Sequence, residues 1–222
     1  GAHSLNLQGC EAEVSTPFGI AHLKLSLLGG HNLANAIAAL GAGLALDWSL
    51  QDCLDGLSQL AAIPGRLQAI PNRCDLTVLV DYAHSPDALR TVLLGLKELK
   101  PSTSKIWTVF GCGGDRDPGK RPKMGAAAEE LSDHCILTSD NPRTEDPLAI
   151  IEAVQLGMRY TPCIETDRRR AIGLAIASAA PGDVVLIAGK GHEATQTIGD
   201  QVIPLDDREV AAESLRLREA SP

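Results

Sequence analysis

Aromatic residues, positive charge and long apolar runs are all scarce in this 222-residue sequence. Aromatic side chains make up 3% of the residues, too few to favour a platform on which bases stack. The net charge is −8 and no basic stripe occurs, which argues against nucleic acid as a partner. There is no signal peptide and no membrane-length apolar stretch, so we expect a cytoplasmic protein without membrane contact.

The cysteines form no recognisable framework. No Cys-x-x-Cys pair occurs, and no His/Cys group has the spacing of a zinc site, so we predict no metal site. Most of them lie in apolar segments, which indicates reduced thiols of a cytosolic protein. The six are Cys10, Cys53, Cys74, Cys112, Cys135 and Cys163.

A Pro-Gly break at Pro64-Gly65 separates two kinds of pattern and predicts a domain boundary, with domains at 1–63 and 64–222. In the first part we expect no regular structure at residues 1–4. The expected elements there are strands at 11–16 and 20–27 and helices at 31–46 and 49–60. The apolar helix at 31–46 is interrupted by Asn, His and Gly, which favours a buried core helix over a membrane span. Such a small set of elements indicates the end of a larger domain.

Beyond the boundary, strand and helix patterns alternate as in a doubly wound α/β domain with a mostly parallel sheet. A hairpin turning at Gly199-Asp200 and a helix at 209–219 complete the prediction. The expected strands are 76–80, 106–110, 134–137 and 184–188.

A polar loop follows each of these strands, and parallel strands place such loops at one edge of the sheet, where open α/β sheets bind ligands. Each residue has a structural explanation too: Asp81 is equally consistent with a helix cap, and His84 and His192 with hydrogen-bonded loop histidines. The expected rim consists of Asp81, His84, Arg116, Asp140, Asn141, Arg143, Lys190, His192 and Glu193.

The loop at 138–145 carries the most informative combination of side chains. It holds an acid, an amide and a guanidinium, with Asn141 biased to extended backbone by the proline after it. Arg143 can bind a carboxylate through two hydrogen bonds while Asp140 faces an ammonium, so a zwitterion is the simplest ligand. The alternative is a solvated turn rich in turn-forming residues.

The glycine-rich loop after the second of these strands fails as a nucleotide motif. Residues 114–121 nearly match a phosphate loop, but Arg121 stands where Ser or Thr must hold magnesium. Pro118 also removes an N–H that would bind phosphate. Gly111-x-Gly113 lacks the third glycine of the dinucleotide fingerprint, which argues against a nicotinamide dehydrogenase.

Six motifs occur in an order that resembles the C-terminal part of the Mur ligases, in particular those that add meso-diaminopimelate. The resemblance runs from about Leu28 to Arg208 and implies a Rossmann-like C-terminal domain preceded by an incomplete central ATPase domain. The motifs are Gly30-His31-Asn32-x-x-Asn35, Pro64-Gly65-Arg66, Asp81-Tyr82-Ala83-His84-x-Pro86, Gly111-Cys112-Gly113-Gly114-Asp115-Arg116-Asp117, Asp140-Asn141-Pro142-Arg143-x-Glu145 and Gly189-Lys190-Gly191-His192-Glu193.

The resemblance implies a peptidoglycan-precursor ligase. ATP with Mg²⁺ would activate the D-glutamate carboxyl of UDP-MurNAc-L-Ala-D-Glu as an acyl phosphate, which the amine of meso-diaminopimelate attacks. Carried over motif by motif, Asn32, Asn35, Arg66 and Asp81 lie on the ATP side, and no residue is assigned as a catalytic base. The implied diaminopimelate site is Arg116, Asp140, Asn141, Pro142, Arg143, Gly189 and Glu193.

The charges agree with that assignment. Two arginines and two carboxylates match a ligand with two carboxylates and two ammoniums. Lysine would leave Arg143, taken as the partner of the distal carboxylate, unpaired at a cost of roughly 2–5 kcal/mol.

The sequence departs from a whole Mur ligase because the UDP-binding domain, phosphate loop, magnesium ligands and modified lysine are missing. We therefore expect a monomeric fragment that is inactive by itself. Two alternatives stay open: a stand-alone amino-acid-binding or regulatory module, and a related ligase of the folylpolyglutamate or cyanophycin type.

Overall fold

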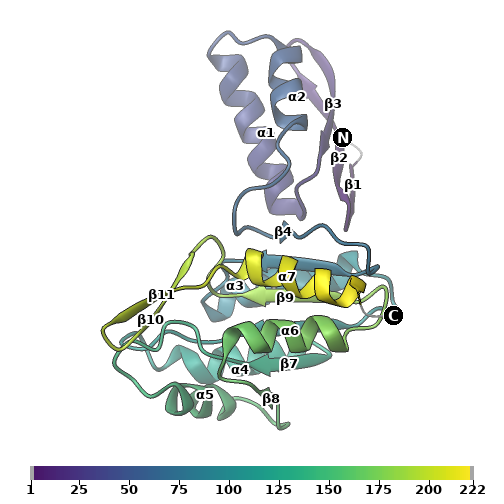
Figure 1. Cartoon of the computed structure of the whole chain (residues 1–222). Coiled ribbons are helices and arrows are strands. Elements are labelled where there is room, and N and C mark those ends of the chain that lie inside the picture. The colour runs from purple at the N-terminus through teal and green to yellow at the C-terminus, as the bar shows by residue number, and fades with distance from the viewer. Residues whose placement is uncertain (1–2, 221–222) are drawn as a thin grey trace. The chain divides into compact units, whose positions relative to one another are not determined.

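The structure, a computed structural model, describes residues 3–220 and divides into two compact units (Figure 1). One comprises the chain up to Ile63 together with Glu98–Lys100. The other comprises Pro64–Lys97 and the chain from Pro101 onward. No helix within residues 3–220 is long and apolar enough to cross a bilayer.

The first unit contains an antiparallel sheet in the order β1-β2-β3 and two helices. His3 and Ser4 pair with Ala12 and Glu11, so the expectation that residues 1–4 lack regular structure is wrong for these two. Gly1 and Ala2 lie outside the described residues. The elements are β1 (His3–Asn6), β2 (Gly9–Thr16), β3 (Gly19–Leu25), α1 (Gly30–Ala45) and α2 (Leu50–Ser58).

Helix α1 is amphipathic, which corrects the prediction of a buried core helix at 31–46. Leu33, Ala36 and Leu40 form its buried stripe, whereas Ile37 and most of the alanines are exposed. The outer face carries mainly small residues, so the sequence is apolar on average although only one stripe packs. Helix α2 begins as expected after Ser49, whose side chain accepts a hydrogen bond from the Asp52 N–H.

The second unit is built on a six-stranded sheet in the order β4-β5-β9-β6-β7-β8. Strand β4 pairs antiparallel with β5, and all other pairs are parallel, which confirms the predicted α/β class with a mostly parallel sheet. The two-residue strands β4 and β8 were not expected. The strands are β4 (Gln68–Ala69), β5 (Thr77–Asp81), β6 (Ile106–Phe110), β7 (His134–Leu137), β8 (Cys163–Ile164) and β9 (Val184–Ala188).

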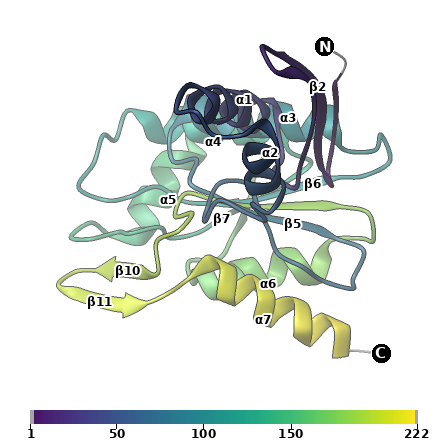
Figure 2. The same ribbon diagram turned by 90° about the horizontal axis from the view of Figure 1, so that it is seen from above.

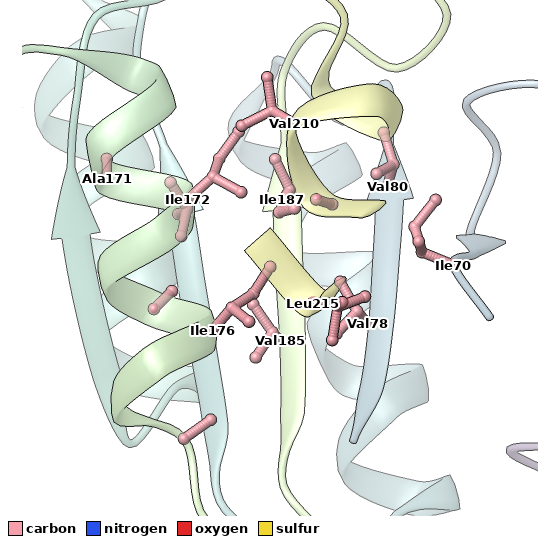
Figure 3. Packing of buried hydrophobic residues seen from close by; sticks show 14 of the residues in the cluster. Ile70, Val78, Val80, Ala171, Ile172, Ile176, Val185, Ile187, Val210 and Leu215 are labelled. Carbon is pink, nitrogen blue, oxygen red and sulfur yellow. The ribbon is translucent and has the colours of Figure 1, made fainter. Parts of the chain in front are cut away.

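Helices cover both faces of this sheet, with α6 and α7 on one side and α3 and α4 on the other (Figure 2). All five residues of the central strand β9 are therefore buried. Branched side chains of β5 and β9 pack against α6 and α7 to form the main core cluster (Figure 3). The helices are α3 (Pro86–Leu99), α4 (Lys120–Leu131), α5 (Pro147–Gln155), α6 (Arg168–Ser178) and α7 (Asp207–Ala220), and a separate hairpin consists of β10 (Thr195–Ile198) and β11 (Gln201–Pro204).

Candidate functional site

A hollow of about 310 Å³ lies at the carboxyl ends of β5, β6, β7 and β9. The loops after these four strands all contribute to its lining, as expected for parallel strands. Pro142 is buried but is not among the lining residues. The other six residues of the predicted amino acid site line it together: Arg116, Asp140, Asn141, Arg143, Gly189 and Glu193.

Arg143 is held in an unusual backbone conformation, with φ at +52°. Such a left-handed conformation costs a non-glycine residue about 1–3 kcal/mol, so the surroundings must enforce it. Strand β10 and its turn do so: the Arg143 N–H donates to the Thr197 carbonyl at 3.1 Å, and the Gly199 N–H donates to the Arg143 carbonyl at 2.6 Å.

The guanidinium of Arg143 is only partly used by the protein. Its Nη1 donates to the Gly114 carbonyl at 2.7 Å, with a longer contact of 3.4 Å to the Asn141 carbonyl. Within the described chain, Nε and Nη2 have no hydrogen-bond partner. The side chain is half-buried and lines the hollow, so these two donors remain available for a ligand.

Asp140 supplies an unpaired negative charge. The residue is 8% exposed, and no group within residues 3–220 hydrogen-bonds its carboxylate. Gln196 holds its backbone, because Nε2 donates to the Asp140 carbonyl at 2.6 Å. A Cβ on Gly189, whose φ is +118°, would lie 2.7 Å from Oδ2 of Asp140, so a glycine keeps this space open.

Asn141 and Lys190, both buried, and the partly exposed Glu193 form a hydrogen-bonded network beside this carboxylate. Asn141 Nδ2 donates to Glu193 Oε2 at 3.0 Å, and Lys190 Nζ donates to the same oxygen at 3.2 Å. Burial by itself would raise the pKa of Glu193, but the hydrogen bonds from Asn141 and Lys190 outweigh it and lower that pKa. Glu193 is therefore a carboxylate at neutral pH, with Oε1 unpaired within the described chain.

The glycine-rich loop and the loop after β7 interlock. The Gly114 N–H donates to the Asn141 carbonyl at 2.9 Å, and a Cβ on Gly114 would lie 1.9 Å from the Pro142 carbonyl oxygen. The Asp115 N–H donates to Glu145 at 2.6 Å. These N–H groups thus bond within the protein, and Pro142 packs against the loop instead of facing the hollow.

Arg168 connects the loops after β7 and β9, which both line the hollow. Its guanidinium donates to both carboxylate oxygens of Asp207, at 2.8 and 2.7 Å. It also donates to the carbonyls of Ala188 and Ser139, which lie just before Gly189 and Asp140 in the chain. Arg168 and Asp207 are fully buried. The pair fixes the ends of two strands from which charged loop residues project.

The remaining lining residues add no nucleophile. Burial is the main cause that raises the pKa of Cys112 to about 11, so its thiol stays protonated at neutral pH. Lys120 Nζ donates to the His84 carbonyl at 2.8 Å. Tyr82 packs against His84 and His192 at ring-centroid distances of 4.6 and 5.4 Å.

The four residues expected on the ATP side are divided between the two units. Asn32 and Asn35 belong to the first unit, where buried Asn32 donates to the Leu28 carbonyl at 2.8 Å and Asn35 is exposed. Arg66 and Asp81 belong to the second unit. Arg66 lies 5.0 Å from the centre of the Tyr82 ring.

Asp81 has a clear structural task. One of its oxygens accepts the Leu67 N–H at 2.7 Å and the other accepts the Ala83 N–H at 2.8 Å. It therefore stabilises the loop after β5, but it is not the helix cap that the alternative interpretation predicted, because the side chain of Ser85 accepts the Ala88 N–H at the start of α3.

Sequence reasoning assigned no role to Gln196 and Thr197, although both hold the loop after β7. They lie in a short alternating strand without any distinctive motif. Lys120 was considered only as part of a failed phosphate loop, yet it lines the hollow. No group of three or more His, Cys, Asp or Glu side chains that could hold a metal ion occurs in residues 3–220.

A model of the family described as "Mur ligase, glutamate ligase domain" matches residues 65–191. The chain is 45% identical over 215 residues to a Chromobacterium violaceum protein named UDP-N-acetylmuramoyl-L-alanyl-D-glutamate–2,6-diaminopimelate ligase, covering 96% of this chain and 44% of that protein. A Coxiella burnetii protein of the same name is 46% identical over 210 residues, covering 94% and 42%. The chain thus spans less than half the length of these curated relatives.

Solved structures give the same picture. A structure of a UDP-N-acetylmuramoyl-L-alanyl-D-glutamate–2,6-diaminopimelate ligase matches with a TM-score of 0.75 at 38% identity, covering 100% of this chain and 45% of that one. The folylpolyglutamate synthase of Thermotoga maritima matches with a TM-score of 0.68 at 20% identity, covering 84% and 42%. This second match shows a shared fold alone.

Proposed function

Because the chain belongs to the Mur ligase family, through its glutamate ligase domain, we propose that it supplies the amino acid site of a ligase that adds meso-diaminopimelate to UDP-MurNAc-L-Ala-D-Glu. Arg116, Asp140, Asn141, Arg143, Gly189 and Glu193 would contact the amino acid, with Pro142 shaping the loop. The observation that carries the proposal is a single hollow lined by carboxylate oxygens and guanidinium nitrogens that have no hydrogen-bond partner within residues 3–220. The names of the similar proteins support the choice of amino acid.

The ligand that fits these charges has an amino acid group at each end. Asp140 and Glu193 would accept its ammonium groups, and Arg143 and Arg116 would bind its carboxylates. The amine that reacts must be neutral, and no side chain in the hollow is placed as its obvious base. We therefore infer that the site acts by orienting the amine towards the activated D-glutamate carboxyl.

The whole ligase would need ATP and Mg²⁺ to activate that carboxyl as an acyl phosphate, and attack by the amine then yields the amide and phosphate. Among the residues expected on the ATP side, Arg66, exposed beside Tyr82, and Asn35, also exposed, are the most available, since Asn32 and Asp81 already bond within the protein. We propose that the chain alone does not complete the reaction.

Arg143 would select meso-diaminopimelate over lysine, which lacks the distal carboxylate. Arg143 is only half-buried and already bonds Gly114, so we set the cost of leaving it unpaired at about 1.5–3 kcal/mol, towards the lower end of such effects. This corresponds to a preference of about tenfold to a hundredfold.

The test is an NMR titration of the 222-residue chain with meso-diaminopimelate, LL-diaminopimelate and lysine, since chemical shifts detect weak binding. We expect the unmodified chain to prefer meso-diaminopimelate, and Arg143→Ala to bind it no better than lysine. Arg159→Ala, which removes an exposed arginine paired with Glu129, is the control and should keep the preference. An unchanged preference in Arg143→Ala would show that another group makes the selection.

A further inference from the structure

Lys190 is a fully buried lysine directly behind the hollow, and it is not among the residues that line it. Its Nζ lies 3.2 Å from Asn141 Oδ1 and 3.2 Å from Glu193 Oε2. An ammonium removed from water is costly unless it is paired and hydrogen-bonded. Both of its partners are residues that would contact the amino acid, so the buried charge acts on the site without touching the ligand.

We propose that Lys190 is a positioning residue whose buried ammonium fixes the orientation of the Asn141 amide and, with it, the Glu193 carboxylate that meets the ammonium group of the amino acid. The proposal deepens the proposed function and rests on it.

The first argument concerns the polarity of the Asn141 carboxamide. Its Oδ1 accepts two hydrogen bonds, from Lys190 Nζ and from the Thr197 N–H at 3.0 Å. Neither donor can accept, so the oxygen must face them and Nδ2 must face Glu193. Rotating the amide would place its NH₂ group against two donors. Lys190 and the backbone of β10 thus decide which side of Asn141 is presented at the hollow.

The second argument concerns the charge of Glu193. Lys190 and Asn141 both bond Oε2, which leaves Oε1 for a ligand ammonium. Burial opposes the carboxylate, and the hydrogen bonds of Asn141 and Lys190 with the charges of Lys190 and Arg143 more than offset it, so the pKa of Glu193 is lowered. Other titratable or charged groups around it are Arg168, which interacts with Glu193, Asp140, which also lines the hollow, and the adjacent His192.

Replacing Lys190 by methionine keeps a long side chain but removes the charge. The pKa of Glu193 should then rise, because burial persists and two of its lowering contributions are lost. A carboxylate binds an ammonium only above its pKa, so the variant should lose affinity at a less acidic pH than the unmodified chain. At about pH 7 we expect binding about tenfold weaker, since Asn141 and Glu193 lose the donor that orients them.

The experiment follows the Glu193 side-chain carboxyl by carbon-detected NMR during a pH titration, in the unmodified chain and in Lys190→Met. The exposed Lys123→Met is the matched control. We expect Glu193 to titrate below its ordinary range in the unmodified chain and in the control, and higher in Lys190→Met. If Lys190→Met does not fold, Lys190→Gln replaces it, because its amide can still donate but carries no charge. An ordinary Glu193 pKa in the unmodified chain overturns the proposal even if neither variant folds.

Binding of meso-diaminopimelate is then measured on the same samples across the acidic range. Failure of the unmodified chain to bind overturns the proposed function and, with it, the role of Lys190 in binding. Binding by the unmodified chain with an unchanged affinity and pH profile in Lys190→Met overturns the Lys190 proposal alone. A weaker affinity that declines at a less acidic pH supports it, because a merely structural defect would not move the pH profile.

Discussion

The pair of Arg168 and Asp207 gives a sharp test of how the second unit is stabilised. Arg168→Met would leave the Asp207 carboxylate, which is fully buried, without its bidentate partner. Breaking a buried pair on one side costs about 3–5 kcal/mol. A domain of this kind is stable by only about 5–15 kcal/mol, so a large share of its stability would be lost.

The neighbouring residue provides the matched control. Arg169 sits one position along α6 and pairs with Glu213, but both side chains are more than half exposed. Arg169→Met should therefore change the stability by no more than about 1 kcal/mol. The unfolding equilibrium constants of the two variants should differ by about two to four powers of ten in water.

Urea denaturation followed by tryptophan fluorescence measures the difference. Trp107 lies on β6 in the same unit as the pair, and Trp48→Phe removes the exposed second tryptophan. Asp207→Asn combined with Arg168→Met should recover part of the loss, because the stranded charge is gone. If Arg168→Met is as stable as Arg169→Met, the buried pair does not stabilise the unit and the reasoning is refuted.

Three further substitutions test other parts of the unit. Asp183 accepts hydrogen bonds from two backbone N–H groups and from Trp107. These hydrogen bonds outweigh the effect of burial and lower the pKa of Asp183. The ionised Asp183 therefore stabilises the fold above its unfolded pKa, and this stabilisation is lost as pH falls through the lower folded pKa. Asp183→Asn should cost about 1–3 kcal/mol at neutral pH, and the difference from the unmodified chain should shrink on acidification in urea titrations. Gly114→Ala should disrupt the interlocked loops, because its Cβ would lie 1.9 Å from the Pro142 carbonyl oxygen. Gly95→Ala, in open space on α3, should instead stabilise by about 0.5–1 kcal/mol in thermal unfolding, and equal effects of the two glycine substitutions would contradict the packing argument.

The sequence predicted the sheet well where burial is continuous. Strands β6, β7 and β9 have the predicted bounds, because an apolar run between covering helices has a clear length. Strand β1 was not predicted because its residues alternate only weakly between apolar and polar. Strands β4 and β8 were not predicted because a strand of two residues shows no pattern. The burial of α1 was misjudged for a related reason, since alanine and glycine do not reveal which face packs.

Most of the rim of the hollow could also be predicted, because the topology of parallel strands places the loop ends together. The exceptions are Asp81, Lys190 and His192, which were expected there and do not line the hollow. The residues that hold these loops in place could not be predicted. Gln196, Thr197 and Arg168 act through contacts distant in sequence, with carbonyls or side chains of the loop after β7 and its flanks. Such contacts leave no local pattern, and the same is true of the burial of Lys190.

The bridge between Arg143 and Ile198 has a consequence for changing the ligand preference of such a domain. The conformation of residues 140–143 depends on hydrogen bonds with β10 and its turn, which lie more than fifty positions later in the chain. These four residues are therefore not an independent structural segment. Transferring only these four residues into a homologue would remove the contacts with β10 and its turn that hold their conformation. An exchange of ligand preference would have to transfer residues 140–143 together with β10 and its turn.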